Sequence, residues 1–124
     1  MSSMIEKKRI LVVDDEAGIL RFVSTSLGLA GFDVITTGSG QEALQFAETQ
    51  NPDLILLDIL MQPMSGFDVL ERLRRFSQIP VIVFTAQRDI AEKAMKHGAD
   101  GFIIKPFVPD ELTKKIRTVL NSLT

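Results

Sequence analysis

The chain has 124 residues, of which 45% are hydrophobic and 24% are charged, and its net charge is −2. This length suits one domain over residues 1–124, and the weakly acidic balance gives no electrostatic reason to expect direct binding of nucleic acid. The sequence has no cysteine, which excludes disulfides, thiolate metal sites and a cysteine nucleophile. No apolar run approaches the length of a membrane span and the N-terminus lacks a signal-peptide core, so we expect a cytoplasmic protein without membrane contact.

Strand-like and helix-like patterns alternate along the chain. Short apolar runs, typical of strands buried on both faces of a parallel sheet, predict five strands at residues 9–13, 32–37, 53–57, 80–84 and 101–104. Apolar residues at steps of three and four predict a helix after each strand, at residues 17–30, 41–49, 66–76, 89–97 and 109–123. This alternation, with right-handed crossovers, predicts an α/β domain whose parallel sheet is covered by helices on both faces.

Four of the predicted strands lead directly into residues suited to phosphate or metal chemistry. These residues are, in chain order, Asp14, Asp15, Glu16, Asp58, Thr85 and Lys105. The carboxyl ends of parallel strands meet at one edge of the sheet, where open α/β sheets bind their ligands. We therefore expect these residues to share one site, with Asp58 at its centre.

Each of these residues taken singly has an ordinary structural explanation, such as a helix start, a turn or a surface lysine. Together they are more specific, because three adjacent carboxylates repel one another unless a cation is present. Mg²⁺ is bound by one or two carboxylates together with waters and a phosphate, and the lysine and threonine can donate to a phosphoryl oxygen. Carboxylates form aspartyl-phosphates in phosphoryl transfer. We therefore predict a phosphate-accepting site with Asp58 as the nucleophile, since Asp15 is needed for the metal.

The motifs of this site also resemble those of a known family, the receiver domains of two-component response regulators. The resemblance covers essentially the whole chain and is carried by Val13-Asp14-Asp15-Glu16, Leu57-Asp58, Thr85-Ala86, Gly98-Ala99-Asp100 and Lys105-Pro106-Phe107. It implies a flavodoxin-like (βα)5 fold, a three-layer sandwich with strand order 2-1-3-4-5. It also implies a signalling phosphoprotein rather than an enzyme.

The resemblance implies a role for each matching position in a magnesium and phosphate site. Asp58 would be the phosphoacceptor and a metal ligand, Asp15 would bind Mg²⁺ directly, and Asp14 would bind it through water. Leu60 would give its backbone carbonyl to the metal. Thr85 would bind a phosphoryl oxygen.

A second group of implied roles concerns the switch. Lys105 would pair with the phosphate, and the Lys105–Pro106 peptide bond would be cis. Phe102 would be the switch aromatic, moving inward as Thr85 moves toward the phosphoryl group. The surface of the fourth helix, fifth strand and last helix would then be rearranged.

The resemblance also implies partners. The phosphoryl group would come from the phosphohistidine of a sensor histidine kinase or a phosphotransfer protein, with self-catalysed transfer and slow autodephosphorylation. A downstream effector protein or domain would bind the rearranged surface, and a homodimer could form through it. No direct contact with nucleic acid is expected of this domain.

Two features depart from the family pattern. Gln62 stands where the family usually has proline, four residues after the phosphoacceptor, and Pro63 follows it. Gln62 keeps a backbone N–H that proline would lack, so the loop beside the metal is expected to differ. The separation of Thr85 and Lys105 is 105 − 85 = 20 residues, about two fewer than in the family, which bears on the output surface.

Three other functions share parts of this pattern or of the fold. A receiver-shaped module could act by protein binding alone, although it would have no chemical need for the complete acid, threonine and lysine set. A small phosphatase using Asp58 as nucleophile typically needs a second acid where Leu60 stands. A flavin-binding protein would place its phosphate at residues 14–16, where the negative charge repels an anion.

Overall fold

The computed structural model describes residues 7–122, which form strands and helices in strict alternation. The strands are β1 (Arg9–Val13), β2 (Asp33–Thr37), β3 (Leu54–Asp58), β4 (Val81–Thr85) and β5 (Gly101–Ile104). The helices are α1 (Ala17–Leu29), α2 (Gly40–Thr49), α3 (Gly66–Arg74), α4 (Arg88–Lys96) and α5 (Pro109–Asn121). Within this described part of the chain, the helices are all too short or too polar to cross a membrane.

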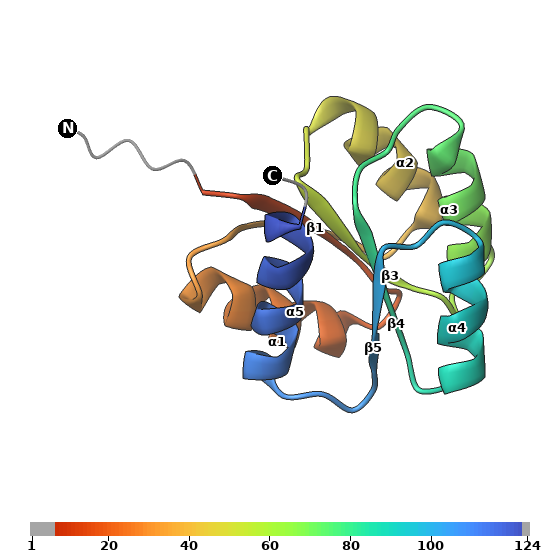
Figure 1. The fold of residues 1–124 in the computed structure, drawn as a ribbon. Helices are drawn as coiled ribbons and strands as arrows, with labels where there is room; N and C mark the ends of the chain where they lie inside the picture. The colour runs from red at the N-terminus through yellow and green to blue at the C-terminus, as the bar shows by residue number, and fades with distance from the viewer. Residues whose placement is uncertain (1–6, 123–124) are drawn as a thin grey trace.

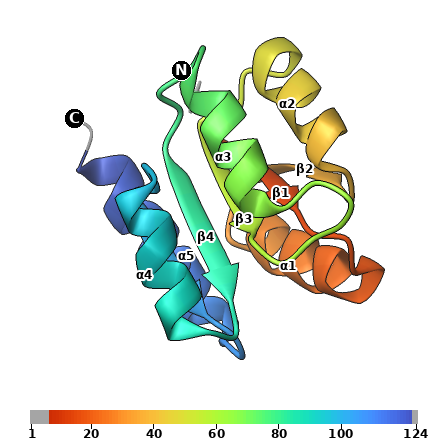
Figure 2. The same ribbon diagram turned by 90° about the vertical axis from the view of Figure 1, so that its right-hand side faces the viewer.

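All strands belong to one parallel sheet in the order β2-β1-β3-β4-β5. Helices α1 and α5 cover one face of this sheet, and α2, α3 and α4 cover the other, as Figure 1 and Figure 2 show from two directions. The predicted α/β class, the flavodoxin-like three-layer arrangement and the strand order are therefore confirmed.

The sheet separates two hydrophobic clusters because successive side chains of a strand point to opposite faces. In the central strand β3, Leu54 and Leu56 pack under α1 and α5, whereas Ile55 and Leu57 pack under the helices on the other face. Every residue of β3 is buried. This burial on both faces explains why the strand appears in the sequence as an unbroken apolar run.

The observed element bounds are identical to the predicted ones or differ from them by one residue, except at the ends of α3 and α5. Helix α3 ends at Arg74 rather than two residues later, because the following N–H groups turn back to the carbonyl of Leu73. Strands β3 and β4 extend to include Asp58 and Thr85, whose backbones continue the parallel pairing. The predicted end of the last helix, residue 123, lies outside the described residues.

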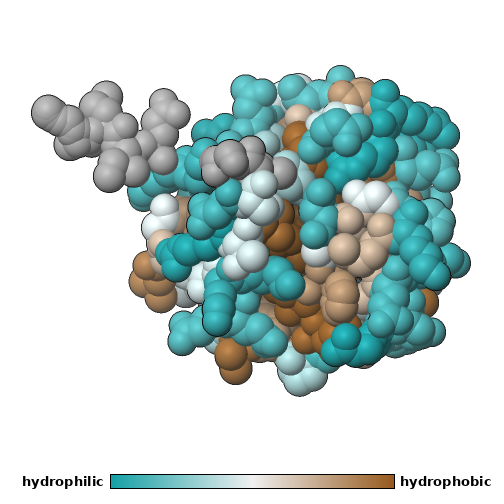
Figure 3. All heavy atoms as spheres, in the orientation of Figure 1, coloured by the Kyte–Doolittle hydropathy of each residue, from teal (hydrophilic) through white to brown (hydrophobic). Residues whose placement is uncertain are grey.

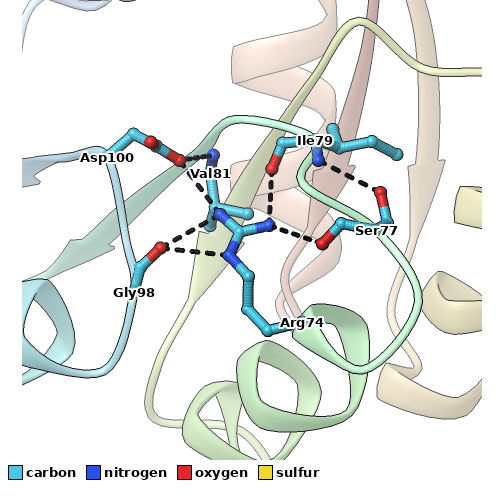
Figure 4. Close-up of polar contacts among 6 residues, drawn as sticks. All are labelled: Arg74, Ser77, Ile79, Val81, Gly98 and Asp100. Atoms are coloured by element: carbon cyan, nitrogen blue, oxygen red, sulfur yellow. Dashed lines mark hydrogen bonds and ion pairs between the residues drawn. The ribbon is translucent and has the colours of Figure 1, made fainter.

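Arg74 links two loops at the edge of the sheet where the strands begin (Figure 4). Its guanidinium donates to the carbonyl of Gly98 at 3.0 and 3.2 Å and to two carbonyls of the α3–β4 loop at 2.8 and 3.3 Å. It also pairs with Asp100 at 3.0 Å, and Asp100 accepts from the N–H of Val81 at 2.8 Å. This network holds the α3–β4 and α4–β5 loops together. It lies at the opposite edge of the sheet from Asp14, Asp15 and Asp58.

Candidate functional site

Strand register brings the predicted site residues to one edge of the sheet. β1 and β3 end in register, so that Asp14 and Asp58 lie side by side. Thr85, the last residue of β4, pairs with Ile104, the last residue of β5, and Lys105 directly follows Ile104. The four residues come from four of the five strands: Asp58 and Thr85 are the last residues of β3 and β4, and Asp14 and Lys105 directly follow β1 and β5.

Three carboxylates gather at the centre of this edge. One oxygen from each of Asp14, Asp15 and Asp58 lies within 4.8 Å of the others. Asp14 and Asp58 are buried and Asp15 is exposed. The backbone N–H of Glu16 donates a hydrogen bond to Asp14 Oδ1 at 2.8 Å. Oxygen ligands grouped in this way fit a hard divalent cation, and one exposed member leaves room for waters. The cluster could therefore bind a metal ion.

Lys105 lies against this cluster. Its Nζ atom is 3.3 Å from Asp14 Oδ2 and 3.7 Å from Asp58 Oδ1, and its side chain is 20% exposed. A partly buried ammonium beside two buried carboxylates offsets part of their repulsion. The lysine therefore places positive charge next to Asp58.

The surroundings of Asp58 raise its pKa from 3.8 to about 6. Burial is the largest cause, and the negative charge of Asp14 adds to it, with a smaller contribution from Asp15. The Lys105 charge and a hydrogen bond from the Leu60 N–H, at 3.3 Å, act in the opposite direction. At neutral pH the Asp58 carboxyl is still mostly ionised, and it is a stronger base than an exposed aspartate.

A pocket of about 220 Å³ opens beside these groups and is lined by Glu16, Asp58, Leu60, Thr85, Ala86 and Lys105. Thr85 is 1% exposed, and its hydroxyl accepts a hydrogen bond from the Gln87 N–H at 3.3 Å. The hydroxyl proton remains available for donation to a ligand oxygen. The structure therefore brings the predicted acid, threonine and lysine positions around one pocket.

Phe102 lies apart from this pocket. It is half-buried against the cluster under α3 and α4, and the Arg88 guanidinium lies 5.6 Å from its ring centroid. Alternation along β4 and β5 puts Thr85 on the same face of the sheet as Phe102. The two predicted switch residues thus share the α4 face, whereas Asp58 belongs to the α1 and α5 face.

The loop after Asp58 contains features that the sequence prediction missed. The Gln62–Pro63 peptide bond is cis, which was not predicted. The Lys105–Pro106 bond is also cis, as the family resemblance implied. Gly66, the first residue of α3, lies so close to the backbone of Asp58 that a Cβ there would overlap it. A glycine directly at a predicted helix start is the signal that could have indicated this close approach.

Comparison with known proteins agrees with this geometry. The sequence matches the response regulator receiver domain family over residues 10–117. It is 42% identical over 118 residues to "Probable transcriptional regulator ycf27" of Cyanophora paradoxa, covering 94% of this chain and 49% of that protein. It is 39% identical over 116 residues to "Alkaline phosphatase synthesis transcriptional regulatory protein PhoP" of Bacillus subtilis (strain 168), covering 91% and 48%. The chain thus spans about half the length of the curated relatives it matches.

Solved structures give the same result. The Vibrio cholerae chemotaxis protein CheY4 superposes with a TM-score of 0.86 at 33% identity, covering 92% of this chain and 99% of that one. The receiver domain of the Francisella response regulator 1452 superposes with a TM-score of 0.88 at 30% identity, covering 95% and 100%. The chain therefore belongs to the response regulator receiver domain family of two-component signalling systems.

Proposed function

We propose that residues 1–124 form a single cytoplasmic receiver domain that accepts a phosphoryl group on Asp58 with the help of Mg²⁺. The donor is the phosphohistidine of a sensor histidine kinase or a phosphotransfer protein. The observation that supports this most directly is the setting of Asp58: a buried carboxylate with two other carboxylates within 4.8 Å and the Lys105 ammonium at 3.7 Å. The domain is then a signalling phosphoacceptor rather than an enzyme acting on a separate substrate.

In the transfer, one Asp58 carboxylate oxygen attacks the phosphorus atom of the phosphohistidine. The new P–O bond forms as the P–N bond breaks, and the imidazole nitrogen keeps the electron pair and takes up a proton. Lys105 faces the added negative charge, and the Thr85 hydroxyl donates to a phosphoryl oxygen. Slow attack of water on the acyl phosphate returns the carboxylate and inorganic phosphate.

The donor set of the acidic cluster fits Mg²⁺. Asp15 and Asp58 would hold the ion directly, Asp14 through a water, and Leu60 through its backbone carbonyl, which agrees with the preference of Mg²⁺ for oxygen ligands and retained waters. When bound, the ion supplies positive charge beside the phosphoryl oxygens and the attacking carboxylate. Lys105 would add further positive charge beside Asp14 and Asp58.

The output surface is proposed to be α4-β5-α5. Phosphorylation draws Thr85 toward the phosphoryl group, and Phe102 moves inward into the space that is released. Figure 3 shows hydrophobic residues exposed between α5 and α4, and Phe102 and Ile104 of β5 are only half-buried. A downstream effector, or a second copy of the domain, binds the rearranged surface more tightly and shifts the population toward it.

Intact-protein mass spectrometry after incubation with acetyl phosphate tests this proposal. The wild-type chain should gain one phosphoryl group when Mg²⁺ is present and none when it is chelated. Asp58→Asn should gain none, whereas Asp89→Asn, which removes an exposed carboxylate of α4, should behave like the wild type. Folded wild-type protein that gains no phosphoryl group would refute the proposal and favour a module that acts by protein binding alone.

A further inference from the structure

Phe84 is a core residue that the function proposed above does not use, yet it lies directly against Lys105. Its side chain is 2% exposed, and its ring centroid is 4.8 Å from Lys105 Nζ. We propose that Phe84 is a positioning residue for phosphoryl acceptance, whose ring holds the Lys105 ammonium beside Asp58. This inference rests on the proposed phosphorylation of Asp58.

Strand register brings the ring and the ammonium together. Phe84 pairs with Asp58 of β3 on one side and with Ile103 of β5 on the other. Its side chain belongs to the cluster under α1 and α5. Lys105 follows Ile103 by two residues, so its side chain leaves the sheet on the same face. The ring and the ammonium therefore meet on that face, next to the phosphoacceptor.

The ammonium has few other partners to fix its position. Among residues 7–122 it donates one hydrogen bond, to Asp14 at 3.3 Å, and its ion pair with Asp58 is longer, at 3.7 Å. Lysine carries its charge on a flexible four-carbon stem. A cation over an aromatic face is attracted by the ring quadrupole, more strongly where water is excluded. An aliphatic residue at position 84 would fill the space without this attraction.

The orientation of the Phe84 ring is itself fixed by other aromatic residues. The Phe107 ring lies 6.2 Å away at an interplanar angle of 86°, and Phe22 of α1 lies 6.2 Å from Phe107. Near-perpendicular pairs of this kind are a favourable arrangement of aromatic quadrupoles. Packing against Phe107 therefore keeps the Phe84 ring in one orientation relative to Lys105.

Fluorinated phenylalanine incorporated at position 84 tests the role of the ring face. Fluorine withdraws electron density from the face and weakens its attraction for a cation, with little change in size. We expect the rate of phosphoryl uptake from acetyl phosphate to fall with each added fluorine, to about three- to tenfold below wild type for the trifluorinated ring. The melting temperature should fall by only a few degrees, because the apolar contacts of the ring are preserved and the attraction for one cation is the main loss.

A matched control incorporates the same fluorinated phenylalanines at position 32 instead of position 84. The Phe32 ring also carries a cation, the Arg117 guanidinium at 5.6 Å, but it lies just before β2, at the edge where the strands begin. Fluorination there should leave the uptake rate unchanged. In a Lys105→Ala background, measured over longer incubation, fluorination at position 84 should also have no effect, because the cation is absent.

The outcomes separate this inference from the proposed function. An uptake rate that is insensitive to fluorination at position 84, in wild-type protein that does become phosphorylated, would overturn the positioning role alone. An equal fluorine effect in the Lys105→Ala background would also overturn it, because the ring would then act independently of the lysine. Failure of the wild-type chain to take up phosphate would overturn the proposed function, and this inference with it.

Discussion

The raised pKa of Asp58 predicts that removing its charge stabilises the domain at neutral pH. The folded-state pKa is about 6 and the ordinary value is 3.8, so the folded state binds this proton more tightly than the unfolded chain does. Stability is therefore lost as pH rises between these two values. A difference of about two pKa units corresponds to about 3 kcal/mol, which is the most that Asp58→Asn can recover.

Asparagine is a suitable replacement because it preserves the shape of the side chain. Its amide oxygen can still accept the hydrogen bond from the Leu60 N–H, and Lys105 keeps its contact with Asp14. Urea unfolding without divalent cations should show Asp58→Asn to be more stable than wild type at about pH 8. The advantage should shrink toward about pH 4, where both side chains are neutral.

Two observations would refute this reasoning. The first is a variant that is no more stable than wild type at about pH 8, and the second is an advantage that does not change with pH. Mg²⁺ provides a control, since a cation that binds the native acidic cluster should stabilise the wild type more than Asp58→Asn. The wild type should then regain part of the difference.

Three further predictions concern the scaffold. Arg74→Ala should lower the free energy of unfolding by about 2–3 kcal/mol in urea, because it leaves loop carbonyls without their donor; a loss below about 0.5 kcal/mol would contradict the network's importance. Gly66→Ala should lower the free energy of unfolding by at least about 3 kcal/mol, because its Cβ would overlap the backbone of Asp58 and Ile59. Stability close to that of the wild type would show that the loop can shift to make room. Gly18→Ala, whose Cβ would meet nothing within 4 Å inside α1, should raise stability by about 0.5 kcal/mol in thermal unfolding, and a decrease would count against this assignment.

Local pattern and residue order were sufficient to predict a parallel sheet and the residues that gather at one of its edges. The apolar run at 54–57 specifies a doubly buried strand, and a parallel sheet carries the residue after each such strand to the same edge. Asp14, Asp58 and Lys105 could therefore be grouped without any coordinates. The strand order came from the family resemblance, because alternation alone permits several orders of parallel strands.

Contacts between distant segments were not visible in the sequence. In the sequence, Arg74 resembles an ordinary solvent-exposed helix residue. Its five hydrogen bonds could not be predicted, because they go to loops whose position depends on the whole fold. Phe84 resembles any apolar strand residue, because periodicity reports burial and not which charged group lies over the ring. The cis bond at Gln62–Pro63 was missed for a similar reason, since proline permits a cis bond without requiring one.

The division of side chains between the two faces of the sheet has a consequence for how such a domain can diverge. Asp58 and Phe84 lie on the α1 and α5 face, whereas Thr85 and Phe102 lie on the α4 face. Under the proposed function, changes beside Phe84 alter how fast the phosphoryl group arrives, and changes around Phe102 alter which protein responds to it. Substitutions on opposite sides of the sheet share few contacts and should combine additively. The rate of phosphoryl uptake can therefore change through substitutions beside Phe84 while the contacts around Phe102 stay the same.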